Sequence, residues 1–319
     1  MSTPAPVAAI PAVAEFAGVS KWYGPVIGVN DVTLRLGSGI TGLVGPNGAG
    51  KSTMIKLMTG QLRPSLGHVR VGGLSAWSAA AKSHVGYCPD VDAFYEEMSG
   101  RAMVRLLARL HGFGRRAAAR RTEEVLDQVG MAARADRPLG SYSKGMRQRI
   151  KLAQALVHDP HLIVLDEPLG GVDPIGRVEL VELFRQLAAQ GKAILISSHV
   201  LEEMDKLADR ILFICHGRIL ASGTLAQIRE MLQEHPLQVR VGADRPRELA
   251  ARLLACESVR GVELEPGGAL LVQVSRPKSF FAALAGLVVD EAFEVHRLQV
   301  SDASTQAVFH YLMDRAGHV

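Results

Sequence analysis

The stretch of sequence that decides the fold is Gly45-Pro46-Asn47-Gly48-Ala49-Gly50-Lys51-Ser52. It matches the pattern G-x-x-x-x-G-K-[ST], and it lies between a short apolar run, residues 41–44, and a helical pattern, residues 52–59. Glycines allow successive backbone N–H groups to point at phosphate oxygens, and the start of the helix adds partial positive charge. The stretch therefore predicts a phosphate-binding loop between a buried strand and a helix.

Two side chains of this loop are expected to carry chemistry. Lys51 would neutralise the β- and γ-phosphates of a nucleotide such as ATP, which also makes it a catalytic candidate. Ser52 would supply a hydroxyl to Mg²⁺. The rest of the loop, residues 45–50, and Thr53 are further candidates for binding the nucleotide.

An acidic pair follows a second apolar run, residues 162–165, in the sequence Leu-Ile-Val-Leu-Asp-Glu-Pro. Asp166 ends the run and is expected to hold Mg²⁺ through water. Glu167 comes next and points differently, so it is the candidate general base or water-orienting group. Such pairs are common on solvated surfaces, but the apolar residues before this one favour a functional site.

Short apolar runs alternate with helical patterns through the first two thirds of the chain. Besides residues 41–44 and 162–165, the runs 193–197 and 211–214 suit strands that are buried on both faces of a mostly parallel sheet. Helical segments, for instance residues 178–190, lie between these runs. This alternation predicts an α/β fold.

Residues 94–158 interrupt the alternation with an Arg- and Ala-rich stretch that has helical spacing and no strand-like run. We predict a helical subdomain inserted into the sheet domain. Its arginines, Arg115, Arg116, Arg120 and Arg121, allow two interpretations, a nucleic-acid patch or a solvated helix face. The second is favoured.

The pattern changes again after Gly223. Strands and helices follow in the order βαββαβ, with a last helix at residues 304–313, as in a small ferredoxin-like α+β module. Residues 1–13 are rich in Ala and Pro, lack the basic flank of a signal peptide, and predict a disordered tail. The expected domains are therefore residues 14–224 and 225–319.

Composition sets limits on the function. A length of 319 residues suits two domains, and a formal net charge of +4 is too weak on its own to imply nucleic acid. The three cysteines form no CxxC pair, which disfavours a disulfide framework or a zinc site. No apolar run reaches the length of about 18 residues that a membrane span requires.

A third motif lies upstream of the acidic pair and reads Ser141-Tyr142-Ser143-Lys144-Gly145-Met146-Arg147-Gln148-Arg149. It occupies the place of the signature, usually LSGGQ, of the ATP-binding-cassette (ABC) family. From about residue 15 to residue 223 the chain resembles the nucleotide-binding domain of that family, with every motif in order. The resemblance implies a P-loop NTPase sheet domain with an inserted helical subdomain, which binds ATP and Mg²⁺.

The resemblance also implies roles for individual residues. Tyr23 is similar to the aromatic residue that stacks on adenine, although a core tyrosine is the alternative. Ser143 and Gly145 would face the γ-phosphate of ATP held by a second subunit. Asp173 would belong to the loop that crosses the dimer interface, and His199 would contact the γ-phosphate. These roles require two cassettes, with ATP between them.

The chain departs from the family pattern at two places. Asp90 follows the strand-like residues 85–87, where the family usually has glutamine, and could bind Mg²⁺ directly or through water. Tyr142, Lys144 and Met146 replace the Leu, the first Gly and the Gln of the signature. This form is similar to signatures in export systems for drugs, lipids and polysaccharides.

The leading hypothesis is an ABC transporter subunit that binds and hydrolyses ATP. It would dimerise, with itself or a related cassette, around two Mg-ATP and drive export through separate integral membrane permease subunits. It would lie at the cytoplasmic face of the cell membrane, with no nucleic-acid partner.

The alternatives are a non-transport ATPase of the same class, acting on ribosomes or DNA, and a regulatory cassette whose ATPase activity is dispensable. The C-terminal module is expected to add dimer contacts or regulation, and the transported substance is not encoded in this chain.

Overall fold

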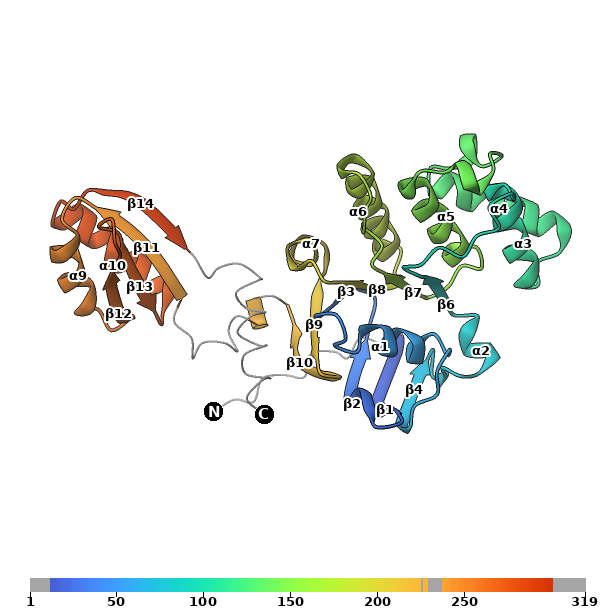
Figure 1. Cartoon of the computed structure of the whole chain (residues 1–319), viewed down its shortest axis with the longest axis horizontal. Helices are drawn as coiled ribbons and strands as arrows, with labels where there is room; N and C mark the ends of the chain where they lie inside the picture. Colours follow the sequence, from blue (N-terminus) through green and yellow to red (C-terminus); the bar gives the residue numbers. More distant parts are fainter. Residues whose placement is uncertain (1–11, 225, 229–236, 301–319) are drawn as a thin grey trace. The chain divides into compact units, whose positions relative to one another are not determined.

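The computed structural model describes residues 12–224, 226–228 and 237–300 of the 319 residues. The chain divides into two compact units between Ser222 and Gly223. Figure 1 labels most of the helices and strands of both units. The first unit holds every residue that the sequence analysis selected for nucleotide chemistry.

A six-stranded sheet runs through the first unit in the order β10-β9-β3-β8-β7-β6. Its strands are β3 Gly39–Val44, β6 Val85–Cys88, β7 Leu162–Asp166, β8 Ala193–Ser198, β9 Arg210–Cys215 and β10 Arg218–Gly223. The neighbours from β9 to β6 pair in parallel. The apolar runs are thus buried strands of a parallel sheet, as predicted, because both faces are covered.

The register of this sheet aligns the carboxyl ends of its central strands. Val44 of β3 pairs with Ser198 of β8, and Asp166 of β7 pairs with Ser197 of β8. The loops that follow β3, β7 and β8 therefore leave the sheet at one edge. In α/β sheets this edge is where ligands bind.

A second sheet in this unit is antiparallel, with the order β2-β1-β4-β5. Its strands are β1 Ala14–Tyr23, β2 Val26–Leu36, β4 Leu66–Val71 and β5 Leu74–Ser75. The sequence analysis did not predict this sheet. Val13, which it assigned to the disordered tail, donates its N–H to the carbonyl oxygen of Leu36 at 2.7 Å and is partly buried. The folded unit therefore begins before residue 14.

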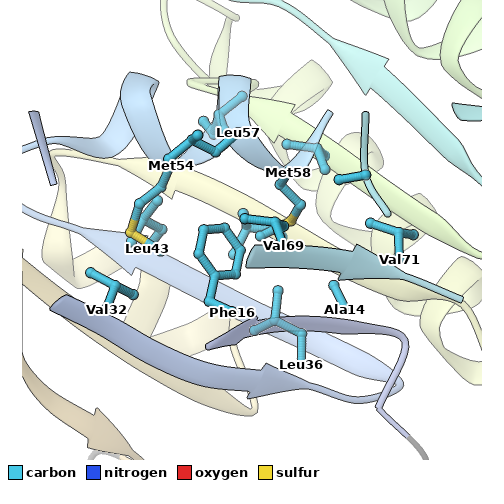
Figure 2. Close-up of a cluster of buried hydrophobic side chains, with 14 of the residues drawn as sticks. Ala14, Phe16, Val32, Leu36, Leu43, Met54, Leu57, Met58, Val69 and Val71 are labelled. Atoms are coloured by element: carbon cyan, nitrogen blue, oxygen red, sulfur yellow. The ribbon is translucent and has the colours of Figure 1, made fainter. Parts of the chain in front are cut away.

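Helix α1, Lys51–Met58, packs between the two sheets. Figure 2 shows Met54 and Met58 of this helix above Phe16 of β1, with Leu43 of β3 in the same cluster. All four side chains are fully buried. Burial of each large apolar side chain contributes about 1.5–3 kcal/mol to stability. This core fixes the helix that follows the phosphate loop.

The helical subdomain predicted at residues 94–158 contains α3 Gly100–Leu110, α4 Arg115–Gln128 and α5 Lys144–Leu156, which contact one another. Arg121 is not a solvated surface residue, because its guanidinium donates to the carbonyl oxygens of Leu156 and Val157. The short helix α2, Ala79–Lys82, precedes β6.

Two more helices flank the central sheet, α6 Pro174–Ala189 and α7 Leu201–Leu207. Helix α6 begins four residues before the predicted start at residue 178. The reason is local, since the Asp173 carboxylate accepts the N–H of Gly176 at 3.1 Å and Pro174 occupies the first helical position.

The second unit has the order β11-α9-β12-β13-α10-β14, as the sequence predicts. Its elements are β11 Leu237–Ala243, α9 Pro246–Leu254, β12 Val259–Leu264, β13 Leu270–Val274, α10 Pro277–Asp290 and β14 Val295–Val300. The strands form an antiparallel sheet in the order β12-β13-β11-β14, a split βαβ arrangement. The helix expected at residues 304–313 lies outside the described residues.

None of the helices in the described part of the chain combines the length and apolarity needed to cross a bilayer.

Candidate active site

The phosphate loop joins β3 to α1 in a conformation that depends on glycine. Gly48 and Gly50 have φ angles of 81° and 111°, in the region that side chains rarely adopt. A Cβ atom on Gly45 would lie 2.2 Å from the carbonyl oxygen of Ile214 in the neighbouring strand β9. The backbone can therefore curl closely over the sheet edge and direct its N–H groups inward.

Lys51 is the first residue of α1 and its side chain is buried beneath the loop. Its Nζ donates to the carbonyl oxygens of Gly45 at 2.6 Å and Pro46 at 3.2 Å. Burial lowers the pKa of Lys51, while the nearby carboxylates of Glu167 and Asp166 oppose that shift. The ammonium therefore lies within electrostatic reach of both acids predicted from the sequence.

The acidic pair lies at the end of β7, and one serine holds both residues. Ser197 of β8 donates its hydroxyl to Asp166 Oδ1 at 2.5 Å. The hydroxyl oxygen of Ser197 also accepts the backbone N–H of Glu167 at 3.0 Å. Glu167 has a φ of 49°, unusual for a residue with a side chain. The two carboxylates have different partners, Ser197 for Asp166 and His199 for Glu167.

His199 follows β8 and reaches the candidate base directly. Its Nδ1 lies 3.0 Å from both carboxylate oxygens of Glu167. The imidazole is 61% exposed and the Glu167 side chain 20% exposed. A cavity of about 200 Å³ adjoins both side chains and is also lined by Gly171 and Arg177. The geometry leaves room for a reacting group beside the pair.

Two of the three residues expected to hold Mg²⁺, Ser52 and Asp166, have the chemistry and exposure that the ion requires. The exposed hydroxyl-bearing Ser52, in the first turn of α1, and Asp166 offer hard oxygen donors. Asp166 Oδ1 accepts from Ser197, while Oδ2 has no hydrogen bond among the described residues. Ser52 and Asp166 therefore fit a magnesium site.

Asp90, the third predicted ligand, has an exposed side chain. Its main chain is held from α5, where Lys151 Nζ donates to the carbonyl oxygens of Pro89 at 2.9 Å and Asp90 at 2.8 Å. Burial raises the pKa of Tyr87 to about 12, with smaller contributions from Asp166 and Asp90. The Mg²⁺ role of Asp90 stays a prediction.

Tyr23, the predicted adenine contact, ends β1 beside the phosphate loop. Its ring is not in the core, because the residue is 44% exposed. Its hydroxyl lies 3.4 Å from Thr53 Oγ1 in the first turn of α1. A flat, exposed aromatic face next to the loop suits stacking on a nucleobase.

The remaining predicted residues form a second group at the starts of α5 and α6. Ser143 caps α5 by accepting the N–H of Met146 at 3.3 Å, and Asp173 caps α6. A Cβ atom on Gly145 would lie 3.7 Å from Asp173 Oδ1, so the two helix starts are neighbours. Within the described residues, no hydrogen bond or ion pair joins this group to the phosphate loop.

Sequence reasoning missed Ser197 and Lys151. The sequence does contain a signal for Ser197, since it is a polar residue at the end of a buried apolar run and such a residue needs a hydrogen-bond partner. Its partner follows only from the register of β7 and β8. Lys151 carries no local signal, since a lysine within a helix is usually solvated.

Comparison with known proteins gives a consistent result. A family model described as ABC transporter matches residues 29–170. The daunorubicin/doxorubicin resistance ATP-binding protein DrrA of Streptomyces peucetius is 33% identical over 301 residues, covering 92% of this chain and 90% of that protein. The Nod factor export ATP-binding protein I of Rhizobium sp. (strain N33) is 36% identical over 224 residues, covering 69% of this chain and 73% of that protein.

Solved structures agree with these relatives. An ATP binding subunit of an ABC transporter matches with a TM-score of 0.64 and 30% identity, over 69% of this chain and 93% of that chain. A dimeric bacterial ABC transporter cassette, MJ0796, matches with a TM-score of 0.62 at 20% identity, over 66% of this chain and 98% of that chain, and this likeness supports the fold. The resemblance inferred from the motifs is confirmed, and the chain belongs to the ABC transporter family as an ATP-binding and ATP-hydrolysing subunit.

Proposed function

We propose that this subunit hydrolyses Mg-ATP with Glu167 as the base, in a closed pair of cassettes that drives export through membrane permease subunits. The observation that carries the proposal is the contact between Glu167 and His199, 3.0 Å from Nδ1 to each carboxylate oxygen. The contact lies beside a buried ammonium, Lys51, that interacts electrostatically with the same carboxylate. A base, its orienting group and a phosphate-binding cation are thus gathered at one sheet edge.

In this mechanism the chain's own groups bind, orient and accept a proton. The Lys51 ammonium exchanges the carbonyl oxygens of Gly45 and Pro46 for phosphate oxygens. Glu167 accepts the proton of the attacking water, and His199 Nδ1 holds the Glu167 carboxylate in place. His199 is exposed enough for its ring to face the γ-phosphate as well.

Ser52 and Asp166 are the proposed ligands of Mg²⁺, directly or through water. The ion, when bound, neutralises charge on the phosphate oxygens. Asp90 is a further candidate ligand, because its exposed side chain follows β6, the strand that pairs with β7, and β7 ends at Asp166.

The separation of the site into two groups supports a dimer. Ser143 and Gly145, at the positive end of α5, form no hydrogen bond or ion pair with the phosphate loop in the described part of their own chain. A second cassette, identical or related, would bring this helix start to the γ-phosphate. ATP binding would then favour closure because only the closed pair contacts the nucleotide from both sides.

Relatives suggest the direction of transport. One is named for daunorubicin and doxorubicin resistance and another for Nod factor export. Together with the signature Tyr-Ser-Lys-Gly-Met, these names support an export system in which this subunit lies peripherally at the cytoplasmic face of the membrane. Neither of these two names points to an ATPase that acts on ribosomes or DNA.

The test is Glu167→Gln, with Glu182→Gln on the exposed surface of α6 as the control. We expect Glu167→Gln to lower steady-state ATP turnover by about 10²–10⁴-fold and to retain ATP. Light scattering should show the variant as a dimer with Mg-ATP and not with Mg-ADP. Turnover at the control rate would remove Glu167 from the mechanism. Purification from membranes with an integral membrane protein would support the permease partnership, and recovery with ribosomes or DNA would contradict it.

A further inference from the structure

Ser197 is a buried hydroxyl at the centre of the site, and no role in the reaction has been assigned to it so far. The residue is 0% exposed and lies at the penultimate position of β8. In the parallel ladder it is the direct partner of Asp166, the last residue of β7. The strand register therefore places this hydroxyl beside the acidic pair.

The Ser197 hydroxyl forms two hydrogen bonds, one as donor and one as acceptor, with two different residues. It donates to Asp166 Oδ1 at 2.5 Å, a length typical of a hydrogen bond from a hydroxyl to a charged oxygen. It accepts the backbone N–H of Glu167 at 3.0 Å. One side chain of β8 thus holds the side chain of Asp166 and the main chain of Glu167.

Each of these hydrogen bonds restricts a group that could otherwise adopt other conformations, the Asp166 carboxylate in one case and the Glu167 backbone in the other. A carboxylate can rotate about its terminal torsion, and the bond to Oδ1 fixes the direction of Oδ2. The backbone of Glu167 is in the left-handed region with φ of 49°, which persists only when surrounding contacts hold it. In this conformation the Glu167 carboxylate meets His199.

We infer that Ser197 is a positioning residue that aims Asp166 at the metal ion and Glu167 at the attacking water through a single hydroxyl. The inference rests on the roles proposed above for Asp166 and Glu167. Ser197 itself touches neither the nucleotide nor the ion. Its removal should weaken the response to Mg²⁺ and slow hydrolysis while nucleotide binding without Mg²⁺ is kept.

The neighbouring serine supplies a matched control. Ser198 is also buried, at 4% exposure, but its hydroxyl accepts the N–H of Val200 at 3.0 Å and has no bond to either acid. Ser198→Ala therefore removes one buried hydroxyl from the same strand end without touching Asp166 or Glu167. A general effect of lost polar contacts in β8 would appear in both variants.

The experiment measures binding of a fluorescent ATP analogue against Mg²⁺ concentration, and in EDTA, for the full-length chain and its variants. We expect Ser197→Ala to raise the Mg²⁺ midpoint about tenfold, to weaken Mg-ATP binding by a similar factor, and to lower kcat at saturating Mg-ATP about tenfold or more. Binding in EDTA should equal that of the unmodified chain, which also reports a folded site. Ser198→Ala should leave the midpoint unchanged.

Asp166→Asn separates failure of this inference from failure of the proposed function. A shifted midpoint in Asp166→Asn with an unshifted midpoint and normal kcat in Ser197→Ala would overturn the role of Ser197 alone. An unshifted midpoint in Asp166→Asn would overturn the magnesium site itself. If the alanine variant does not fold, Ser197→Cys, a weaker donor of similar size, is measured in its place. An intermediate midpoint in that variant supports the inference, and the midpoint of the unmodified chain overturns it.

Discussion

Lys151 Nζ lies 2.8 Å from the carbonyl oxygen of Asp90, and this bond ties α5 to the loop that follows β6. The same ammonium donates to Pro89 and forms an ion pair with Asp92 at 3.0 Å. Arg147, one helical turn earlier, binds Glu96 at 2.6 Å in the same loop. The helix that begins at the signature motif therefore holds the segment in which this chain departs from the family pattern.

Lys151→Met should loosen this loop. The Lys151 side chain is 6% exposed, so its loss leaves two carbonyl oxygens without this donor and leaves Asp92 with only its longer contact to Arg147. We expect a loss of about 1–3 kcal/mol in the free energy of unfolding of the first unit. Faster hydrogen exchange in residues 89–96 should accompany it. Lys278→Met, an exposed lysine of α10, is the control, and equal exchange in both variants would contradict the prediction.

Gly45→Ala should abolish nucleotide binding. The new methyl group would lie 2.2 Å from the carbonyl oxygen of Ile214, which is rigid backbone. Gly73→Ala is the control, because Gly73, in the turn between β4 and β5, also has a positive φ but has nothing within 4 Å of its added Cβ. That variant should lose about 1–2 kcal/mol of stability through strain and still bind. Binding is measured by titration with a fluorescent ATP analogue, and similar losses in both variants would count against the steric argument.

Lys51→Ala should weaken binding of ATP more than binding of adenosine. The buried ammonium has only main-chain carbonyl oxygens as hydrogen-bond acceptors among the described residues, and phosphate oxygens are stronger acceptors. We expect a loss of about tenfold to hundredfold in ATP affinity. Lys56→Ala, on the exposed side of the same helix, should bind ATP normally in calorimetric titration. Unchanged ATP affinity in Lys51→Ala would argue against the phosphate role.

His158 should make the first unit sensitive to mild acid. Burial, and to a smaller extent His111, which is stacked on its ring with a centroid separation of 3.9 Å, lower the pKa of His158 to about 4. A hydrogen bond to the Val85 carbonyl and the nearby Asp159 oppose this shift. Because the unfolded chain binds a proton near pH 6.5 and the folded chain does not, stability is present above that pH and is lost as the pH falls from about 6.5 to about 4.

The loss at His158 should reach about 3 kcal/mol at the acid end of this window. His158→Gln should flatten the dependence of the unfolding free energy on pH, measured by denaturant titration between pH 4 and pH 7. His296→Gln, at an exposed position of β14, should keep the slope of the unmodified chain. An identical slope in the two variants would assign the acid sensitivity to other groups.

The sequence was sufficient for the parts of the site that local motifs define. The phosphate loop needs only a strand, glycines and a helix in series, and the acidic pair needs only a buried strand that ends. The antiparallel sheet around β1 and β2 was not predicted, because its strands are partly exposed and lack continuous apolar runs. Asp173 was assigned only to an interface, and its second role as the cap of α6 displaced the predicted start of that helix.

Contacts between segments distant in the sequence could not be predicted, for a different reason. The bond from Ser197 to Asp166 joins residues 31 positions apart, and the bond from Lys151 to Asp90 joins residues 61 positions apart. Each depends on which strand lies next to which and in what register. Apolar runs of similar composition, such as those of β7 and β8, do not specify that order.

The register of β8 against β7 decides whether the groups that hold Glu167 can reach it. The Ser197 hydroxyl accepts the backbone N–H of Glu167, and His199, two positions later, contacts the Glu167 carboxylate through Nδ1. Slippage of β8 by a single position against β7 would place Ile196 or Ser198 opposite Asp166, and in either register His199 would leave its place at the Glu167 carboxylate. ATPase activity in this chain should therefore be a sensitive reporter of correct strand alignment, because a shifted register leaves the Glu167 carboxylate without His199.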